Sequence, residues 1–389
     1  MKEPMGNSVI AQTTAKPRAG RHSHGFDPWL EIDRAAFHHN VRQALRLAGG
    51  RPIMAVVKNN AYGLGDSVVG PLLAECDQVA AIACVRVAEA VSMRQAGVSK
   101  PILNMAEVSE EEAVELVRQR VWLSVWLDSA PERLARVAQR VGHPVPVHLY
   151  LDTGMGREGM PYYRALPWIE TLCCQPAVRV DGTFMTFAHD LDFDHEQLAR
   201  FMATVGEARA RGLALGTLHA APSFELFALP EAHLDMVRPG NMLFGNYPRV
   251  EGARERASLR SVFSLRARVV RLERLRPGDS AGFYRSYIAT RPTWIALLPV
   301  GHTDGYPVGA ANTCQVLIRG RLYPVVSVVS SAHMIVEIGD EKTVEIGDIA
   351  TLIGSDDPAI EPLAVAEKAG VRVLTILTKM NPRLPRYVV

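Results

Sequence analysis

The sequence predicts an α/β protein in which a (β/α)8 barrel of the TIM type is followed by a mostly β C-terminal domain. Its 389 residues are enough for two or three domains. From Arg51 to Leu243, short apolar or β-branched runs alternate with amphipathic segments, which is typical of βα units around a parallel sheet. After Pro248, helical periodicity becomes scarce and strand-like runs follow one another between turn residues.

The first region contains eight strand-like runs. They are Ile53–Val57, Val79–Cys84, Pro101–Met105, Trp122–Leu127, Val145–Leu151, Arg179–Thr186, Thr217–Ala221 and Met236–Leu243. Helix-like segments lie between them, and one of these begins at Ser109 with Glu112 three residues on, the spacing of a capping box. Eight βα repeats favour a closed barrel over an open doubly wound sheet, which usually has five or six strands.

The second region reads as a domain of short strands. Its strand-like runs are Ser261–Leu272, Thr293–Val300, Cys314–Ile318, Tyr323–Val329, Met334–Ile338 and Ile349–Leu352, and its one helical pattern is Glu361–Lys368. The early strand-like segment Trp29–Asp33 precedes the barrel and is a candidate to pair with this domain. We therefore expect a flexible tail at residues 1–26, a barrel at residues 27–248 and a β-rich domain at residues 249–389.

Composition excludes several classes of function. The 43 basic and 41 acidic side chains leave a formal net charge of +2, which argues against nucleic acid or an anionic membrane as the main partner. The polar first 25 residues lack the apolar run of a secretory signal or membrane span, so we expect a cytoplasmic protein. The five cysteines and the histidines show no metal-ligand spacing, and no metal is expected.

Barrels carry their active sites at the carboxyl ends of the strands, so polar residues that follow apolar runs are the first candidates. Lys58 directly follows the first run. Burial at the barrel rim would favour its neutral amine and make it a Schiff-base nucleophile, although a surface lysine opening a loop is the simpler alternative. Arg157 closes a glycine-rich segment after the fifth run and suits a carboxylate or phenolate. Ser223, Gly240 and Asn241 follow the last two strands, where barrels commonly hold phosphate.

Four segments in order give the chain a resemblance to the alanine racemase family of fold-type III pyridoxal-phosphate enzymes. They are Ala55–Gly63, Leu151–Gly159, Asp235–Gly245 and Val300–Pro307, and the resemblance spans both domains from residue 29 to residue 386.

The resemblance implies that Lys58 carries pyridoxal 5'-phosphate as a Schiff base and later moves a proton at the substrate α-carbon. It implies phosphate contacts from Tyr62, Ser223, Gly240 and Asn241. It further implies that Arg238 faces the pyridine nitrogen, and that Arg157 orients the cofactor oxygen and the substrate carboxylate. A small amino acid is the implied substrate, and a head-to-tail homodimer the implied assembly.

The chain departs from the family pattern at the second base. The family uses a tyrosine from the partner subunit on the face opposite the lysine, and an ungapped match places Phe283 there. Tyr284 follows at once, but neighbouring side chains in a strand point to opposite faces, so Tyr284 serves only if a bulge shifts the register. Ser331 and Ala332 also replace larger residues that border the substrate in the family.

We therefore expect an alanine racemase-like amino-acid racemase, with Lys58 and Tyr284 as its bases and Arg157 and Ser331 at the substrate. Phe283 keeps two alternatives open. One is a one-base enzyme on the same cofactor, such as an aldolase, a decarboxylase or a stereoretentive exchange enzyme. The other is a protein that binds the cofactor without turnover. The sequence leaves open which amino acid is used.

Overall fold

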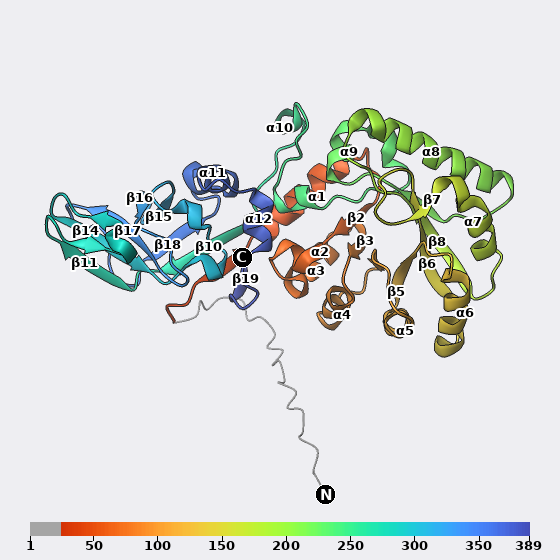
Figure 1. The fold of residues 1–389 in the computed structure, drawn as a ribbon, viewed down its shortest axis with the longest axis horizontal. Helices are drawn as coiled ribbons and strands as arrows, with labels where there is room; N and C mark the ends of the chain where they lie inside the picture. The colour runs from red at the N-terminus through yellow and green to blue at the C-terminus, as the bar shows by residue number, and fades with distance from the viewer. Residues whose placement is uncertain (1–24) are drawn as a thin grey trace, which may run out of the picture.

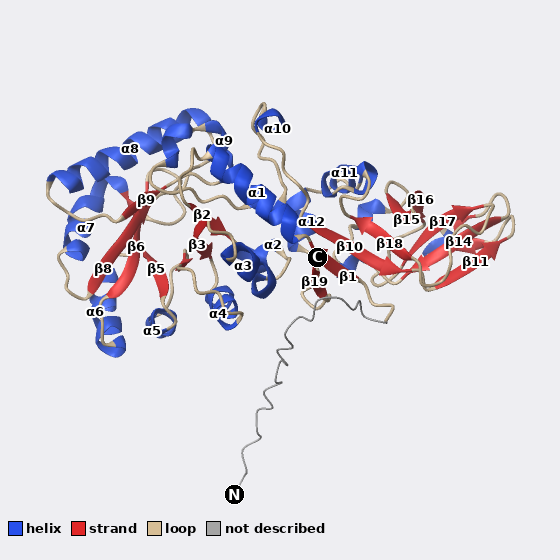
Figure 2. Cartoon of the chain, turned by 180° about the vertical axis from the view of Figure 1, so that it is seen from behind, coloured by secondary structure: helices blue, strands red, loops and turns tan. Residues whose placement is uncertain are grey.

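The computed structural model describes residues 25–389 and has two lobes, a helix-covered barrel and a long β domain (Figure 1). Residues 1–24 of the tail expected at residues 1–26 lie outside the described residues. Figure 2 shows the two lobes from behind, with helices around the strands of the first lobe and mostly strands in the second. Among the described residues, no helix is both long and apolar enough to cross a bilayer.

The barrel sheet is parallel and its strands follow chain order. They are β2 (Ile53–Val56), β3 (Val79–Cys84), β4 (Ile102–Asn104), β5 (Val121–Val125), β6 (Val145–Asp152), β8 (Val178–Phe184) and β9 (Thr217–His219), with β7 (Met160–Pro161) beside the end of β6. Side chains alternate across these strands, as a parallel sheet requires. Met54, Val56, Ala81, Ala83 and Leu103 form one buried cluster inside the barrel, and the intervening residues join the larger core beneath the helices.

The helices of this lobe surround the sheet (Figure 2). They are α1 (Arg34–Leu47), α2 (Lys58–Tyr62), α3 (Asp66–Ala74), α4 (Val87–Gln95), α5 (Glu110–Arg118), α6 (Ala130–Val141), α7 (Ala165–Cys173), α8 (Leu191–Ala210) and α9 (Ser223–Ala228). The expected capping box is confirmed, because the Ser109 hydroxyl accepts the Glu112 N–H at 3.3 Å and the Glu112 carboxylate accepts the Ser109 N–H at 2.9 Å.

The eighth strand is shorter than predicted. Instead of a strand over Met236–Leu243, single bridges join Met236 to His219 and Val237 to Ile53, and these bridges close the barrel. Pro239 then follows, and it has no N–H to continue the ladder. The chain turns into a 3-10 helix, η3 (Asn241–Phe244), so Gly240 and Asn241 lie on a turn at the barrel mouth.

The β domain is built on a nine-stranded sheet of order β11-β14-β17-β16-β15-β18-β10-β1-β19. Its strands are β1 (Trp29–Ile32), β10 (Phe263–Arg268), β11 (Arg271–Leu275), β14 (Thr293–Leu298), β15 (Gln315–Ile318), β16 (Arg321–Val326), β17 (Met334–Gly339), β18 (Ile349–Ile353) and β19 (Arg386–Val388), and β12 (Ser280–Ala281) pairs with β13 (Tyr287–Ile288). The expected pairing of the early strand is confirmed, because β1 lies antiparallel to β10 and parallel to β19.

This domain follows the prediction only in part. The run Ser261–Leu272 divides into β10 and β11. The helical pattern of Glu361–Lys368 forms α11 (Pro362–Lys368), and a second helix, α12 (Val373–Thr378), was not expected. The remaining short helix, α10 (Ala253–Arg256), lies in the connection between the lobes. The unexpected helix α12 packs against α2 at the barrel mouth and thereby brings the β domain to the candidate site.

Candidate active site

A cavity of about 1050 Å³ opens at the carboxyl ends of the barrel strands. Seven of the residues singled out from the sequence line it, namely Lys58, Tyr62, Arg157, Ser223, Arg238, Gly240 and Asn241. Arg372 reaches the same cavity from the residue that precedes α12, so both lobes contribute to its wall. The structure thus brings together the strand-end residues of the barrel, which lie far apart in the sequence.

Lys58 follows β2 and begins a left-handed turn. The four residues after it all have positive φ: 58° at Asn59, 54° at Asn60, 49° at Ala61 and 52° at Tyr62. A left-handed helical conformation costs roughly 1–2 kcal/mol per residue for L-amino acids, and asparagine tolerates it better than most. A turn of this length therefore needs strong support from its surroundings.

The main support of the turn is the buried carboxylate of Glu89 on α4. It accepts the Asn60 N–H at 2.9 Å, and its other oxygen accepts the N–H groups of Val85 and Arg86 at 3.1 and 3.0 Å. The Asn60 side chain in turn accepts the Asp66 N–H at 3.1 Å. These bonds tie the lysine turn to the first turns of α3 and α4.

The β domain holds the other end of the turn. Gly63 has φ 89°, and a Cβ there would lie 1.9 Å from the carbonyl oxygen of Leu377 on α12, so only glycine fits. The Arg386 guanidinium on β19 donates to the carbonyl oxygens of Gly63 at 2.9 Å and Leu64 at 3.0 Å. The position of Lys58 therefore depends on both lobes.

The lysine lies in an environment that favours its neutral form. Burial lowers the pKa of Lys58, and the nearby positive charge of Arg157 lowers it further. A primary amine with a lowered pKa is a better nucleophile toward a carbonyl carbon at neutral pH. This is the electrostatic setting that the Schiff-base prediction requires.

Tyr62, Ser223 and Gly240 form a cradle of donors beside the lysine. The Ser223 hydroxyl accepts the N–H groups of Gly240 at 3.0 Å and Met242 at 3.3 Å. A Cβ on Gly240 would lie 2.4 Å from the Tyr62 hydroxyl, so the absence of a side chain keeps this space open. Burial raises the pKa of Tyr62, and its hydroxyl stays protonated as a donor.

This cradle fits a phosphate group. Asn241 follows Gly240 on the same turn and also lines the cavity. Backbone amides on a tight turn, two hydroxyls and a glycine that leaves space are the groups that commonly bind a phosphate monoester at this end of a barrel. The residues present therefore suit pyridoxal phosphate, with Lys58 in the same cavity for its aldehyde.

Arg238 is buried and rigidly oriented. Its guanidinium donates to Nδ1 of His219 at 2.8 Å and to the carbonyl oxygen of Ala220 at 3.0 Å, and it stacks 4.8 Å from the Phe184 ring. Burial lowers the pKa of Arg238 to about 10, so it remains a cation at neutral pH. A fixed cation of this kind donates to a ring nitrogen without giving up its own proton.

Two buried histidines extend from Arg238 into the barrel. Because Arg238 has only donors, Nδ1 of His219 accepts, and Nε2 of His219 therefore donates to Nδ1 of His148 at 2.8 Å. Burial lowers the pKa of His148 to about 3 and that of His219 well below its usual range, so both rings are neutral. This series of hydrogen bonds fixes the tautomer of each ring and holds the guanidinium in place.

Arg157 lies at the rim of the cavity. Its loop is held by Asp152, whose carboxylate accepts the N–H groups of Gly154 at 2.9 Å and Gly156 at 3.2 Å. The Arg157 side chain is 57% exposed and lies 3.6 Å from the Glu158 carboxylate. It is available to a ligand that enters from solvent.

Tyr284 and Ser331 do not line this cavity within one chain. The strand geometry assumed for residue 284 is wrong, because Phe283–Arg285 form a 3-10 turn, η4, between β12 and β13. Tyr284 has φ 60° and is 95% exposed, and Phe283 is 64% exposed, so both rings project from the tip of the turn. Ser331 is also exposed, and its carbonyl oxygen accepts the Thr303 hydroxyl at 2.7 Å.

Several residues of the cavity were not predicted from the sequence. Tyr150 on β6 donates to the Thr186 hydroxyl at 2.9 Å and stacks on Phe184 with ring centroids 4.3 Å apart. Its place in the alternation of a strand was a usable signal. Arg372 offered none, because α12 was not expected. His189 follows the sixth predicted strand by three residues, and this position was a usable signal as well.

Comparison with known proteins agrees with this geometry. Residues 32–248 match the family model for the alanine racemase N-terminal domain, and residues 262–388 match the model for its C-terminal domain. The chain belongs to the alanine racemase family. Family membership makes it an isomerase, a pyridoxal-phosphate-dependent amino-acid racemase.

Individual relatives match over nearly their whole length. The chain is 35% identical to the alanine racemase of Syntrophobacter fumaroxidans, over 84% of this chain and 88% of that protein. It is 32% identical to that of Carboxydothermus hydrogenoformans, over 93% and 99%.

Solved structures match as well. The biosynthetic alanine racemase of Pseudomonas aeruginosa has a TM-score of 0.78 at 28% identity, over 93% of this chain and 99% of that one. The Bacillus anthracis alanine racemase with bound L-Ala-P has a TM-score of 0.82 at 25% identity, over 95% and 96%. These matches confirm the predicted barrel followed by a β domain.

Proposed function

We propose that the chain interconverts the L and D enantiomers of alanine, with Lys58 as the base on one face of the substrate and Tyr284 of a second copy as the base on the other. The observation that carries the proposal is the meeting of Lys58, the donor cradle and Arg238 in one cavity. The names of the relatives favour racemisation over the one-base and non-catalytic alternatives.

Each side chain has a defined task in this reaction. Bound pyridoxal phosphate supplies an electron sink for the negative charge that develops at the α-carbon. Tyr62, Ser223, Gly240 and Asn241 hold the phosphate, and Arg157 holds the substrate carboxylate at the rim. Lys58, with its lowered pKa, exchanges a proton with the α-carbon on its own face, which is the work of a general base near neutral pH. When Lys58 accepts the proton of one enantiomer, Tyr284 of a second copy donates a proton on the opposite face, and in the reverse direction the two exchange roles.

Arg238 limits where charge accumulates. It donates a hydrogen bond to a ring nitrogen and keeps its own proton, because even its lowered pKa of about 10 lies far above that of a pyridine. His219 and His148 hold it there as neutral rings. A cofactor ring nitrogen beside Arg238 would accept this hydrogen bond and would stay without a proton.

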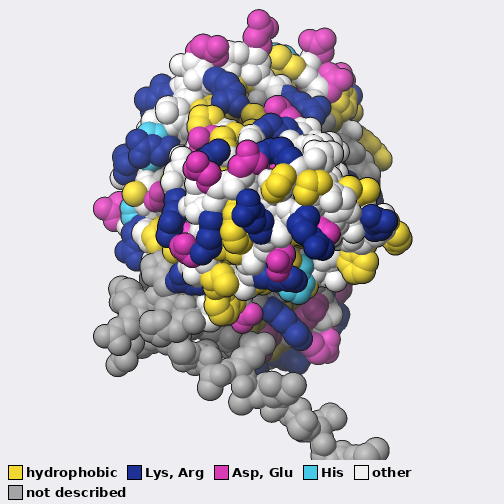
Figure 3. Space-filling view, turned by 90° about the vertical axis from the view of Figure 1, so that its left-hand side faces the viewer, with side chains coloured by type: hydrophobic (Ala, Val, Ile, Leu, Met, Phe, Trp, Pro, Cys, Tyr) yellow, Lys and Arg dark blue, Asp and Glu magenta, His cyan; other side chains and the backbone are white. Residues whose placement is uncertain are grey.

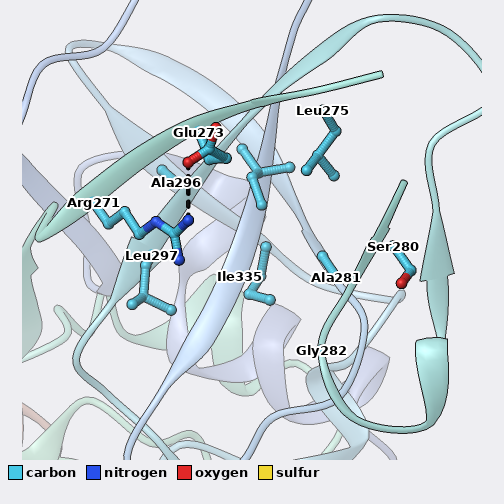
Figure 4. Close-up of a pocket in the computed structure, with 10 residues that line it drawn as sticks. Arg271, Glu273, Leu275, Ser280, Ala281, Gly282, Ala296, Leu297 and Ile335 are labelled. Carbon is cyan, nitrogen blue, oxygen red and sulfur yellow. Dashed lines mark hydrogen bonds and ion pairs between the residues drawn. The ribbon is translucent and has the colours of Figure 1, made fainter. Parts of the chain in front are cut away.

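The proposal includes a head-to-tail homodimer. Two aromatic rings at the tip of η4 face solvent in a single chain, which leaves Tyr284 free to enter a neighbour. Beside the tip lies a cavity of about 220 Å³, where Leu275, Ala281 and Ile335 form an apolar wall and Arg271 pairs with Glu273 (Figure 4). Figure 3 shows the end of the molecule that carries this domain, with apolar side chains between basic ones. Such a mixed surface suits an interface between copies.

We also propose that the enzyme acts in the cytoplasm. All five cysteines are free, which suits a reducing compartment.

The test is proton NMR in heavy water with the cofactor-loaded protein and a panel of L-amino acids, followed by chiral chromatography. Loss of the α-proton signal of L-alanine together with appearance of D-alanine supports the proposal. Exchange without the D enantiomer would refute the two-base reaction. Lys58→Ala is the matched control and should show neither change.

A further inference from the structure

His189 lies in the loop between β8 and α8 and lines the same cavity as Lys58 and Ser223. Its backbone has φ 63°, a conformation that residues other than glycine rarely adopt. The loop is held in this shape by Gln197, whose side chain accepts the Ala188 N–H at 2.8 Å. Strain of this kind persists only where the surroundings fix it, and it is concentrated at functional sites.

A fully buried carboxylate orients the His189 ring. Glu225 on α9 has no exposed surface, and its Oε1 lies 2.8 Å from Nδ1 of His189. Burial together with the charge of Glu225 raises the pKa of the neighbouring Asp194 to about 6. A desolvated carboxylate is stable only beside a cation, and His189 is the cation that contacts it.

The hydrogen bond to Glu225 raises the pKa of His189, which favours the imidazolium form, whereas the positive charge of Lys58 across the cavity acts in the opposite direction. Nδ1 is occupied by Glu225, so Nε2 remains as a second N–H donor. The ring packs against Phe224 with centroids 5.3 Å apart and its side chain is 51% exposed.

Helix α9 carries both the partner of this cation and part of the donor cradle. Ser223, Phe224 and Glu225 are consecutive in its first turn, and His189, which contacts Phe224 and Glu225, lines the same cavity as Ser223. The cradle itself contains only neutral groups, namely the Tyr62 and Ser223 hydroxyls and the N–H groups of Gly240 and Met242, which already donate to Ser223. A phosphate monoester carries nearly two negative charges at neutral pH, and hydrogen bonds from a cation to it are about twice as strong as neutral ones.

We propose that His189, held by Glu225, is a direct ligand of the cofactor phosphate and adds through Nε2 the positive charge that the neutral cradle lacks. This inference rests on the proposed function, because it assumes that pyridoxal phosphate is the occupant. It concerns a residue outside the four motif segments on which the family resemblance stands.

The experiment compares two ligands that differ only in the phosphate. The apoprotein and its His189→Asn and His189→Gln variants are titrated with pyridoxal phosphate and with pyridoxal, and bound ligand is followed by absorbance. The ratio of the two dissociation constants measures the phosphate contribution to affinity. His195→Asn is the matched control, because His195 also pairs with a glutamate, Glu231, but lies outside the cavity lining.

We expect both His189 variants to weaken pyridoxal phosphate roughly tenfold or more while pyridoxal binding stays the same, and His195→Asn to change neither. Unchanged affinity for pyridoxal phosphate in the His189 variants overturns the proposal. Equal weakening of both ligands also overturns it, because His189 would then support only the shape of the site. If the unaltered protein binds neither ligand, the proposed function itself is wrong.

Discussion

Replacing Glu89 with glutamine tests whether this carboxylate holds the left-handed turn after Lys58. The carboxylate is buried and accepts three backbone N–H groups, from Asn60, Val85 and Arg86. Glutamine retains one acceptor oxygen, so at least one of these donors faces the new NH2 group instead. A buried hydrogen bond to a charged group contributes roughly 1.5–3 kcal/mol, and we expect Glu89→Gln to lower the free energy of unfolding by about 3 kcal/mol.

The matched control is Glu112→Gln. Glu112 also accepts a backbone N–H three residues before it, at 2.9 Å, but it does so on the surface. Its replacement should lower the free energy of unfolding by about 0.5 kcal/mol or less. Urea denaturation followed by circular dichroism measures both variants. Equal shifts would refute the role assigned to Glu89. Glu89 is also one of the anions that raise the pKa of Lys58, so Glu89→Gln should lower that pKa further.

Four further outcomes are expected. Lys58→Ala and Tyr284→Phe should each reduce racemisation by roughly a hundredfold or more. When the two variants are mixed, half of the randomly paired dimers carry one complete site, so activity should return to about a quarter of that of the unaltered protein. No recovery would refute the sharing of sites between subunits. Asp194→Asn should raise the free energy of unfolding by about 1 kcal/mol at pH 7 and by little near pH 4. Because the pKa of Asp194 is raised to about 6, the folded state binds more protons than the unfolded state between these two pH values. The unaltered protein therefore becomes less stable as pH rises from 4 to 7, and the asparagine variant does not share this loss. A pH-independent difference in thermal denaturation would contradict this. Gly63→Ala should destabilise the protein by about 3 kcal/mol or more, since its Cβ would lie 1.9 Å from Leu377 O at φ 89°, and a normal melting temperature would contradict that contact. Gly240→Ala should weaken pyridoxal phosphate more than pyridoxal in the same titrations, because its Cβ would lie 2.4 Å from the Tyr62 hydroxyl, and Tyr62→Phe in the same chain should relieve part of the loss.

The barrel was predictable because its signals are local. Strand runs such as Val79–Cys84 recur between amphipathic segments, and each strand of a parallel sheet ends at the same rim. Residues that follow those strands, such as Lys58 and Ser223, therefore meet in the cavity, and this meeting can be predicted without knowing how the helices pack. Their roles in binding and catalysis stay predictions.

Other features depend on information that periodicity does not carry. The hand of the turn after Lys58 is set by Glu89, which lies on another helix. The hydrogen bonds from Arg238 through His219 to His148 join the segment after the Val237 bridge to β9 and β6, and no local pattern connects these segments. The exposed conformation of Tyr284 comes from the turn η4, where the prediction assumed a continuous strand. Helix α12 has one and a half turns, which is too short to give a clear amphipathic pattern.

The pairing of β1 with β19 has a consequence for how the enzyme is made. The barrel is an insertion between β1 and β10, and its strands can pair as they leave the ribosome, whereas β1 must wait for partners that are synthesised much later. Arg386 on β19 then binds the carbonyl oxygens of Gly63 and Leu64. A nascent chain with a finished barrel still lacks this clamp on the Lys58 turn, so competence for chemistry arrives with one of the last strands to be made.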